Sequence, residues 1–160
     1  MDILYHPIGV IRSPFTSVGS MPVQPVGAGG AQGAVEVDPL YQEGLKDLGG
    51  FSHLILIYHF HKARPCSLTV TPFLDTQARG LFATRAPSRP NSIGLSVVEL
   101  IGVEGNRLSV AKIDILDRTP LLDIKPYVPE FDARPDAIGE WVEITRGAAS
   151  SKLSDDRFKA

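Results

Sequence analysis

The feature that most constrains the fold of this chain is how often glycine and proline interrupt it. Fifteen glycines and thirteen prolines are spread over 160 residues, and the apolar runs between them are short. Proline lacks a backbone N–H and glycine is unfavourable inside helices, so a chain interrupted this often does not sustain long helices. Short apolar runs separated by turn residues are typical of β-barrels. We therefore predict a mainly β fold, a compact single-domain β-barrel with a short helix and a long N-terminal loop.

Eight apolar runs are predicted to form the strands. They cover residues 8–11, 33–37, 53–60, 67–71, 81–84, 93–103, 108–115 and 121–124. The clearest hairpin joins the runs 93–103 and 108–115, because Gly105 and Asn106 between them tolerate the positive φ of a tight turn.

The short helix and the long loop lie before the third of these runs. The helix is predicted at residues 39–48, with Asp38 as its cap and Gly49 at its end. Residues 16–32 have no periodicity, and loops of this length in compact domains are usually functional or disordered. The glycines of residues 27–33 do not follow a strand and open a helix, so they are not a dinucleotide-binding fingerprint.

Composition limits the setting of the protein. A net charge of −2 exerts no global attraction on nucleic acid or membrane, so any polyanion must meet a local basic patch. The single cysteine, Cys66, suits a reducing cytoplasm. The longest apolar run, residues 54–58, is far too short to span a bilayer, and we expect no membrane association. We predict a barrel domain at residues 1–135 and a C-terminal extension at 136–160 that is loosely ordered or docks on a partner subunit.

A basic cluster is the densest chemical signal. Between residues 62 and 91 the charged residues are Lys62, Arg64, Arg79, Arg85 and Arg89 against Asp75, a local charge of +4. Pro87 and Pro90 stiffen the loop that carries the last two arginines. Such a patch suits phosphates or a substrate carboxylate, with arginine favoured for bidentate contact. The alternative is solvated surface charge that pairs with acids elsewhere in the fold.

A second signal is the run of residues 114–127, which contains three aspartates, a Thr-Pro turn and a Lys-Pro-Tyr sequence. Its composition resembles a ligand-lined rim more than a plain pair of strands. Asp117 and Thr119 have a simpler explanation, because such residues bind their own backbone in turns. That explanation does not cover the whole run.

The third signal is a set of histidines. On a strand, His53, His59 and His61 would project from one face. A His-x-His pair binds zinc or iron when further ligands converge on it, but no carboxylate is spaced to do so. We therefore predict no metal site and expect hydrogen-bonded core or pocket histidines. A metal-dependent barrel enzyme that uses His59 and His61 stays as an alternative.

Seven segments together carry a resemblance to a known family. They are residues 8–15 (IGVIRSPF), 51–53 (FSH), 60–61 (FH), 80–87 (GLFATRAP), 89–91 (RPN), 93–96 (IGLS) and 123–127 (DIKPY). In this order they resemble the TsaA/TrmO-like (YaeB-like) family of β-barrel tRNA methyltransferases, over about residues 8–129.

The resemblance implies a homodimer that binds S-adenosylmethionine outside any Rossmann fold and methylates N6 of threonylcarbamoyladenosine beside the tRNA anticodon. The cofactor residues that it implies are Pro22, Gln24, His61, Lys62, Arg85, Leu95, Asp117, Arg118, Thr119 and Pro120. The threonylcarbamoyl group carries a carboxylate, and the cations assigned to it are Arg85, Arg89 and Lys125, with Arg79 as a weaker candidate. Asn91 and Tyr127 are assigned to hydrogen bonding or stacking on the extruded base. No general base is identified from the sequence.

Three residues depart from the family pattern. Val23 replaces an arginine of Pro-Arg-Gln, Ser92 replaces the second proline of Arg-Pro-Asn-Pro, and Arg118 replaces the glycine of Asp-Gly-Thr-Pro. If the last turn needs a positive φ, arginine is strained there. Val23 and Arg118 favour an alternative function, in which a catalytically idle barrel binds RNA or senses S-adenosylmethionine.

Overall fold

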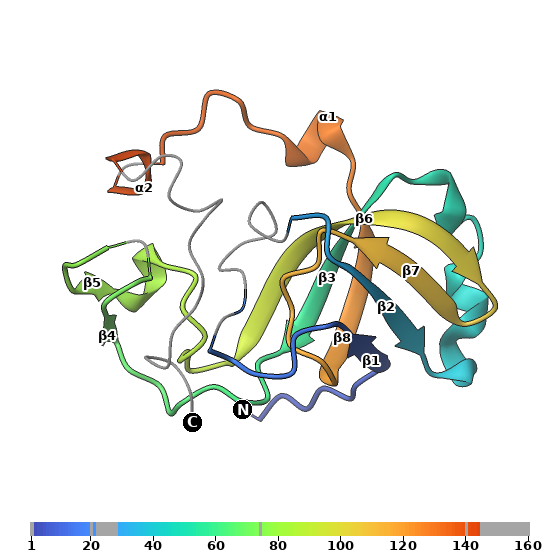
Figure 1. The fold of residues 1–160 in the computed structure, drawn as a ribbon, viewed down its shortest axis with the longest axis horizontal. Coiled ribbons are helices and arrows are strands. Elements are labelled where there is room, and N and C mark those ends of the chain that lie inside the picture. Colours follow the sequence, from blue (N-terminus) through green and yellow to red (C-terminus); the bar gives the residue numbers. More distant parts are fainter. Residues whose placement is uncertain (1, 20, 22–28, 74, 140, 145–160) are drawn as a thin grey trace.

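The computed structural model describes residues 2–19, 21, 29–73, 75–139 and 141–144 (Figure 1). Six antiparallel strands form a closed barrel in the order β1-β2-β7-β6-β3-β8. They are β1 (Gly9–Arg12), β2 (Gln32–Val37), β3 (His53–His59), β6 (Ile93–Glu104), β7 (Arg107–Ala111) and β8 (Thr119–Pro126). The prediction of a mainly β barrel is confirmed.

The barrel closes because β1 pairs with both β2 and β8. Ile11 lies opposite Val35 on one side and opposite Thr119 on the other. The core follows the alternation of a strand: Leu54, Leu56 and Tyr58 of β3 are buried, and the residues between them face outward. The other fully buried large side chains of the barrel are Ile11, Val35, Val98, Leu108, Val110, Ile113, Ile115 and Leu121.

A smaller unit lies beside the barrel and contains the basic cluster. Its two-stranded sheet pairs β4 (Thr69–Val70) with β5 (Arg79–Gly80), and the 3-10 helix η4 (Leu81–Ala83) follows directly. Val70, Leu81 and Ala86 form its own small core, with Phe73 packed against them. Figure 1 shows this unit on the far side of the barrel from the β6–β7 hairpin.

Several predicted boundaries need correction. The strand predicted at 81–84 is wrong, because Thr84 donates both its backbone N–H and its hydroxyl to the Leu81 carbonyl and closes a 3-10 turn. The strand predicted at 108–115 ends at Ala111, since Lys112 has a φ of 58°. The strand predicted at 67–71 is only the two residues of β4.

The hairpin turn and the helix cap are where the sequence placed them. Gly105 has a φ of 59° between β6 and β7, and the Asp38 side chain accepts from the Leu40 N–H at 2.9 Å. The helical segment itself is two 3-10 helices, η2 (Pro39–Leu45) and η3 (Leu48–Gly50), so Gly49 lies inside the second rather than ending the first.

The segment after the barrel contains two short helices that were not predicted, α1 (Pro129–Asp132) and α2 (Trp141–Ile144). The tail beyond residue 144 and residues 20 and 22–28 of the predicted 16–32 loop lie outside the described residues. Across the part of the chain that is described, no helix has the length and apolar character needed to cross a membrane.

Gly94, near the start of β6, gives a test of the side-chain packing at one end of the barrel. The ring of Tyr58 lies directly over Gly94, so a Cβ there would collide with three ring carbons. We expect Gly94→Ala to lower the free energy of unfolding by about 1–3 kcal/mol, measured by urea denaturation. The matched control is Gly102→Ala in the same strand, where a Cβ meets nothing within 4 Å. Equal losses in both variants would contradict the packing described.

Candidate functional site

A cavity of about 430 Å³ opens at one end of the barrel. Antiparallel pairing brings the end of β3, the start of β6 and the start of β8 to this end, and the smaller unit forms the opposite wall. The described lining residues are Val18, Met21, Tyr58, Phe60, His61, Lys62, Ala63, Pro72, Phe73, Thr84, Arg85, Ala86, Pro87, Arg89, Ile93, Gly94, Leu95, Asp114, Ile115, Leu116, Thr119 and Trp141. The lining is therefore mostly apolar, with charged groups at a few positions.

The floor of the cavity carries a chain of three polar side chains from three segments. The Ser96 hydroxyl donates to Asp114 Oδ1 at 2.7 Å, and the Tyr58 hydroxyl lies 3.0 Å from Ser96 Oγ. Ser96 has one proton, so when it donates to the ionised Asp114, Tyr58 donates to Ser96. Ser96 is 3% exposed and Tyr58 is 5% exposed, so these two are shielded from bulk water, whereas Asp114 is half-buried.

This environment changes the acidity of two of the three groups. Burial raises the pKa of Asp114 from its ordinary value of 3.8 to about 6, against the opposing effects of the Ser96 hydrogen bond and the Arg85 charge. Burial and the nearby Asp114 charge also raise the pKa of Tyr58. Asp114 thus titrates close to neutral pH, which is where a proton acceptor is most effective.

The second wall of the cavity is formed by the turn after β3 and the start of β8. His61 Nδ1 lies 3.4 Å from Thr119 Oγ1, and the Thr119 hydroxyl donates to the Leu116 carbonyl at 2.7 Å. Burial, followed by the charges of Lys62 and His59, lowers the pKa of His61. His61 is therefore uncharged near neutral pH, and Lys62 supplies the positive charge of this wall.

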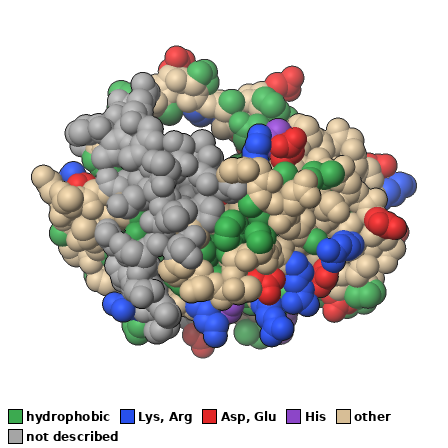
Figure 2. Space-filling view, in the orientation of Figure 1, with side chains coloured by type: hydrophobic (Ala, Val, Ile, Leu, Met, Phe, Trp, Pro, Cys, Tyr) green, Lys and Arg blue, Asp and Glu red, His purple; other side chains and the backbone are tan. Residues whose placement is uncertain are grey.

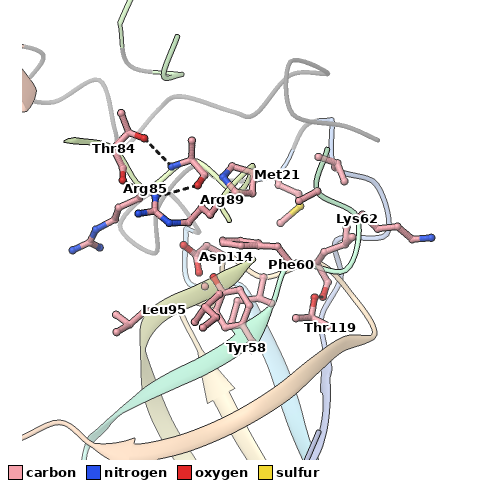
Figure 3. Close-up of a pocket in the computed structure, with 18 of the residues that line it drawn as sticks. Met21, Tyr58, Phe60, Lys62, Thr84, Arg85, Arg89, Leu95, Asp114 and Thr119 are labelled. Atoms are coloured by element: carbon pink, nitrogen blue, oxygen red, sulfur yellow. Dashed lines mark hydrogen bonds between the residues drawn. The ribbon is translucent and has the colours of Figure 1, made fainter. Parts of the chain in front are cut away.

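The basic cluster divides between structural and pocket positions. Arg79 pairs with Asp75 at 2.7 Å and lies 5.7 Å from the Trp141 ring, away from the cavity lining. Arg89 donates to the carbonyls of Thr84 and Ala86 at 3.0 and 3.4 Å, which fixes the loop that carries Arg85 (Figure 3). The expectation of surface ion pairing holds for Arg79, whereas Arg85, Arg89 and Lys62 line the cavity.

Surface charge elsewhere is mixed. In Figure 2, hydrophobic side chains gather near the centre of the visible face, and basic side chains along its lower right are interspersed with acidic ones. On this face, the described residues form no uninterrupted basic surface.

The Asp-Arg-Thr-Pro turn contributes one residue to the lining, Thr119. Asp117 Oδ1 accepts from the Ser13 N–H at 3.1 Å, and the Asp117 N–H donates to the Phe15 carbonyl at 2.7 Å. Asp117 thus ties the turn to the segment after β1 instead of binding its own turn, so the simpler explanation from the sequence is wrong for Asp117. It holds for Thr119, whose hydroxyl donates to the Leu116 carbonyl three residues earlier. Arg118, exposed, and Pro120 are not among the described lining residues.

Other predicted site residues lie away from the cavity. Lys125 pairs with Asp123 at 2.8 Å, and the Tyr127 ring lies 6.3 Å from that of His53. Lys125 lies near the end of β8 and Tyr127 directly after it, whereas Thr119 lies at the start of the strand, beside the cavity. Asn91 is exposed and is not in the described lining. Pro22 and Gln24 lie outside the described residues, although Val18 and Met21 of the same loop line the cavity.

The prediction that His53, His59 and His61 project from one face of a strand is wrong for His61. His53 and His59 alternate with buried residues of β3 and face outward, whereas His61 lies beyond the strand and turns into the cavity. Among the described residues no three His, Cys, Asp or Glu side chains are grouped as a metal ion would need.

Two features of the cavity were missed from the sequence. The Tyr58–Ser96–Asp114 chain left one signal, a serine at an inward position of β6, and its partners come from β3 and from the segment between β7 and β8. Trp141 lines the cavity from α2, and its indole N–H donates to the Ala83 carbonyl at 3.0 Å.

The fold and the cavity define a barrel protein with a small-molecule pocket at the strand ends, outside any Rossmann architecture. The sequence model of the tRNA-methyltransferase O N-terminal domain matches residues 10–133, and the chain belongs to this family. The resemblance noted from the sequence is confirmed.

Relatives agree with this assignment. A probable S-adenosyl-L-methionine-binding protein of Pyrococcus abyssi is 51% identical over 156 residues, which cover 98% of this chain and 85% of the relative. The tRNA (adenine(37)-N6)-methyltransferase of Escherichia coli K12 is 36% identical, covering 90% of this chain and 66% of the enzyme. A crystal structure of TrmO from Pseudomonas aeruginosa superposes with a TM-score of 0.75 at 43% identity, covering 88% of this chain and 63% of that one. The chain therefore spans less than two thirds of the solved TrmO chain.

The backbone at Arg118 tests the predicted strain in the turn. Its φ is 61°, a conformation that favours glycine. We expect Arg118→Gly to raise the free energy of unfolding by about 0.5–1 kcal/mol, because relief of the left-handed strain exceeds the entropy lost by glycine. Arg118→Ala is the matched control, since it removes the charge but keeps the Cβ and should bring no such gain. A gain of equal size for alanine would assign the effect to charge.

Proposed function

We propose that this chain binds S-adenosylmethionine in the cavity at the barrel end and transfers its methyl group to N6 of the adenosine at tRNA position 37. The observation that carries the proposal is the apolar cavity bordered by cations in a fold of the tRNA-methyltransferase O family. The proposed substrate form is threonylcarbamoyladenosine, whose carboxylate suits the cavity cations.

The residues present fit the donor. A volume of about 430 Å³ is in the range of small-molecule sites. Phe60, Leu95 and Leu116 offer apolar surface to an adenine ring, and Lys62 and Arg85 suit a carboxylate. The proposed donor contacts also include His61, Thr119 and, from the N-terminal loop, Pro22 and Gln24.

Asp117, Arg118 and Pro120 are proposed to act on the donor through Thr119. Asp117 anchors the turn by its bonds to Ser13 and Phe15. The anchored turn then fixes where the Thr119 side chain meets the cavity. Their contribution is therefore to position a contact that Thr119 makes.

When bound, the donor supplies an electrophilic methyl group on a sulfonium. The side chains of the cavity hold the two reactants in line and keep water away from them, and positioning of this kind contributes on the order of 7 kcal/mol in good cases. Arg85 lies at the cavity wall, where a cation meets either the donor or the nucleoside carboxylate.

The substrate contacts proposed for Arg89 and Asn91 follow from the loop that Arg89 fixes, which borders the cavity. Arg79 would act indirectly, through Trp141. Lys125 and Tyr127 lie at the other end of β8, away from the cavity of their own chain. We propose that they contact a part of the tRNA that extends past this cavity, or a tRNA bound in the cavity of a second copy. The second possibility requires the proposed homodimer.

Two further proposals concern setting and organisation. A tRNA substrate and a single cysteine support a cytoplasmic location. Residues 1–135 are proposed as the methyltransferase barrel and residues 136–160 as its extension, of which Trp141 already contributes to the cavity.

The rival function is a catalytically idle barrel that binds RNA or senses the donor. The strained backbone at Arg118 favours it, because a turn that flanks Thr119 departs from the glycine of the family pattern.

Titration calorimetry with S-adenosylmethionine, followed by methyl transfer to tRNA with and without the threonylcarbamoyl group, separates the two functions. Trp141 is the only tryptophan, so its fluorescence gives an independent binding signal. We expect donor binding and methylation of the threonylcarbamoyl form. Binding without methylation of either RNA would favour the rival.

Arg85 and Arg89 are predicted to affect different steps. We expect Arg85→Ala to weaken donor binding by about tenfold or more, since it removes a charged partner, with calorimetry as the measurement. Arg89→Ala is expected to weaken tRNA binding and, because its carbonyl contacts fix the loop that carries Arg85, to weaken donor binding less than Arg85→Ala does. Arg89→Lys tests how much of the effect comes from the lost carbonyl contacts. The matched control is Arg107→Ala, an exposed arginine of the β6–β7 hairpin. Unchanged donor and tRNA affinity in both variants would refute the site.

A further inference from the structure

The Tyr58–Ser96–Asp114 chain is an unusual way to close the end of an apolar barrel. The barrel core around it consists of aliphatic side chains, and burying a carboxylate among them opposes folding. A smaller apolar residue would fill the position of Asp114 without that cost. Buried polar chains with a titrating group beside a cavity are typical of functional sites.

The hydrogen bonds hold the carboxylate at a defined place. Asp114 follows β7 in the segment that ends at the β8 turn, Ser96 comes from β6 and Tyr58 from β3, so three separate segments fix it. The Ser96 hydrogen bond engages Oδ1, and Tyr58 acts on the carboxylate through Ser96. Figure 3 shows Asp114 between Tyr58 on one side and the Arg85–Arg89 segment on the other.

The charged and titratable groups around Asp114 come from every side of the cavity. Tyr58 lies beneath it, and Arg85 faces it from the smaller unit. Lys62 and His61 belong to the second wall, with Asp117 acting on His61 from behind that wall. Among the described residues that line the cavity, Asp114 is the one carboxylate.

We propose that Asp114 is the proton acceptor of the methyl transfer, held in place by Ser96 as a positioning residue; the inference rests on the proposed function. The acceptor nitrogen N6 carries a hydrogen, and its lone pair is delocalised into the purine and the carbamoyl group. In the transfer the N6–methyl bond forms as the sulfur–methyl bond breaks with its electron pair left on sulfur, and the N6 proton passes to the Asp114 carboxylate. The products are the neutral thioether, N6-methylated nucleoside and protonated Asp114.

His61 is the other neutral base in the cavity. Its Nδ1 donates to Thr119 Oγ1, since the Thr119 hydroxyl donates to the Leu116 carbonyl, and burial, followed by the Lys62 charge, lowers the pKa of His61 and so disfavours protonation at Nε2. Phe60 lies between the Asp114 side and the Thr119–Lys62 side of the cavity in Figure 3. His61 is therefore better suited to contact the donor than to take up a proton.

The proposal fixes the pH dependence. With a pKa of about 6, Asp114 is mostly ionised at neutral pH, so kcat/KM for tRNA rises with pH and levels off above about pH 6. The Ser96 hydrogen bond lowers this pKa, so Ser96→Ala should move the acidic limb to higher pH with a smaller effect on the plateau.

The decisive variant is Asp114→Asn, which keeps the shape and can still accept from Ser96. We expect kcat to fall by about 100-fold or more, the acidic limb to disappear, and the dissociation constant of S-adenosylmethionine to change less than about threefold. The matched control is Asp47→Asn, an exposed aspartate with a φ of 66°, which asparagine tolerates. It should leave rate and pH profile unchanged.

A measurement without donor or tRNA checks the titration itself. The folded pKa of about 6 exceeds the ordinary value of 3.8, so ionisation disfavours the folded state. As the pH rises from about 4 to about 6, the parent should lose stability relative to Asp114→Asn, and the difference should then stay constant. Urea unfolding at each pH measures it and shows that the variants fold.

The outcomes are distinct. A parent that methylates no tRNA would refute the proposed function. A parent that methylates tRNA, with Asp114→Asn retaining its rate and acidic limb, would overturn the inference alone. Loss of donor binding with an unchanged kcat at saturation would also overturn it, because Asp114 would then be a binding group.

Discussion

The pairing of β1 with β8 is the interaction on which this structure depends. Gly9, Val10 and Ile11 pair with residues 119–121 and close the sheet on itself. The direct pairing of β3 with β8 places the start of β8 beside the end of β3, since Tyr58 lies opposite Leu121. In the closed barrel Thr119, Tyr58 and Asp114 line one cavity, although they are up to 61 positions apart in the sequence.

The core of the barrel and its cavity end differ in what their side chains contribute to stability. The core is aliphatic and follows the strand alternation, which stabilises the fold. At the cavity end the same alternation places Ser96 and Tyr58 inward, where they hold a carboxylate that opposes folding when ionised. Groups that lower the stability of the fold are common at functional sites, where activity requires them. Gly94 belongs to the same arrangement, because the absence of a side chain lets the Tyr58 ring lie against β6.

Local sequence patterns predicted what depends on local chemistry. The strand near residues 53–60, the turn at Gly105 and the Asp38 cap each need only a few neighbouring residues, and all three predictions are confirmed. The 3-10 turn at Leu81–Ala83 was missed because an apolar run of that length also suits a strand, and the hydroxyl of Thr84 decides between them. The family resemblance supplied most of the predicted cavity residues. The chain from Tyr58 to Asp114 escaped prediction because its members are joined across strands, and no spacing in the sequence indicates that register.

The arginines in and beside the cavity have different roles: Arg79 and Arg89 hold the backbone, and Arg85 lines the cavity. Arg79 and Arg89 are both basic and near in sequence, but the first is held by Asp75 and the second by two carbonyls. These bonds fix the backbone of the smaller unit, which keeps Arg85 at the cavity wall facing Asp114. Burial disfavours the ionised carboxylate, whereas the Ser96 hydrogen bond and, to a smaller extent, the Arg85 charge favour it. The balance leaves Asp114 titrating near pH 6 rather than at either extreme, so a single substitution on either side of the balance shifts its acidity in a known direction.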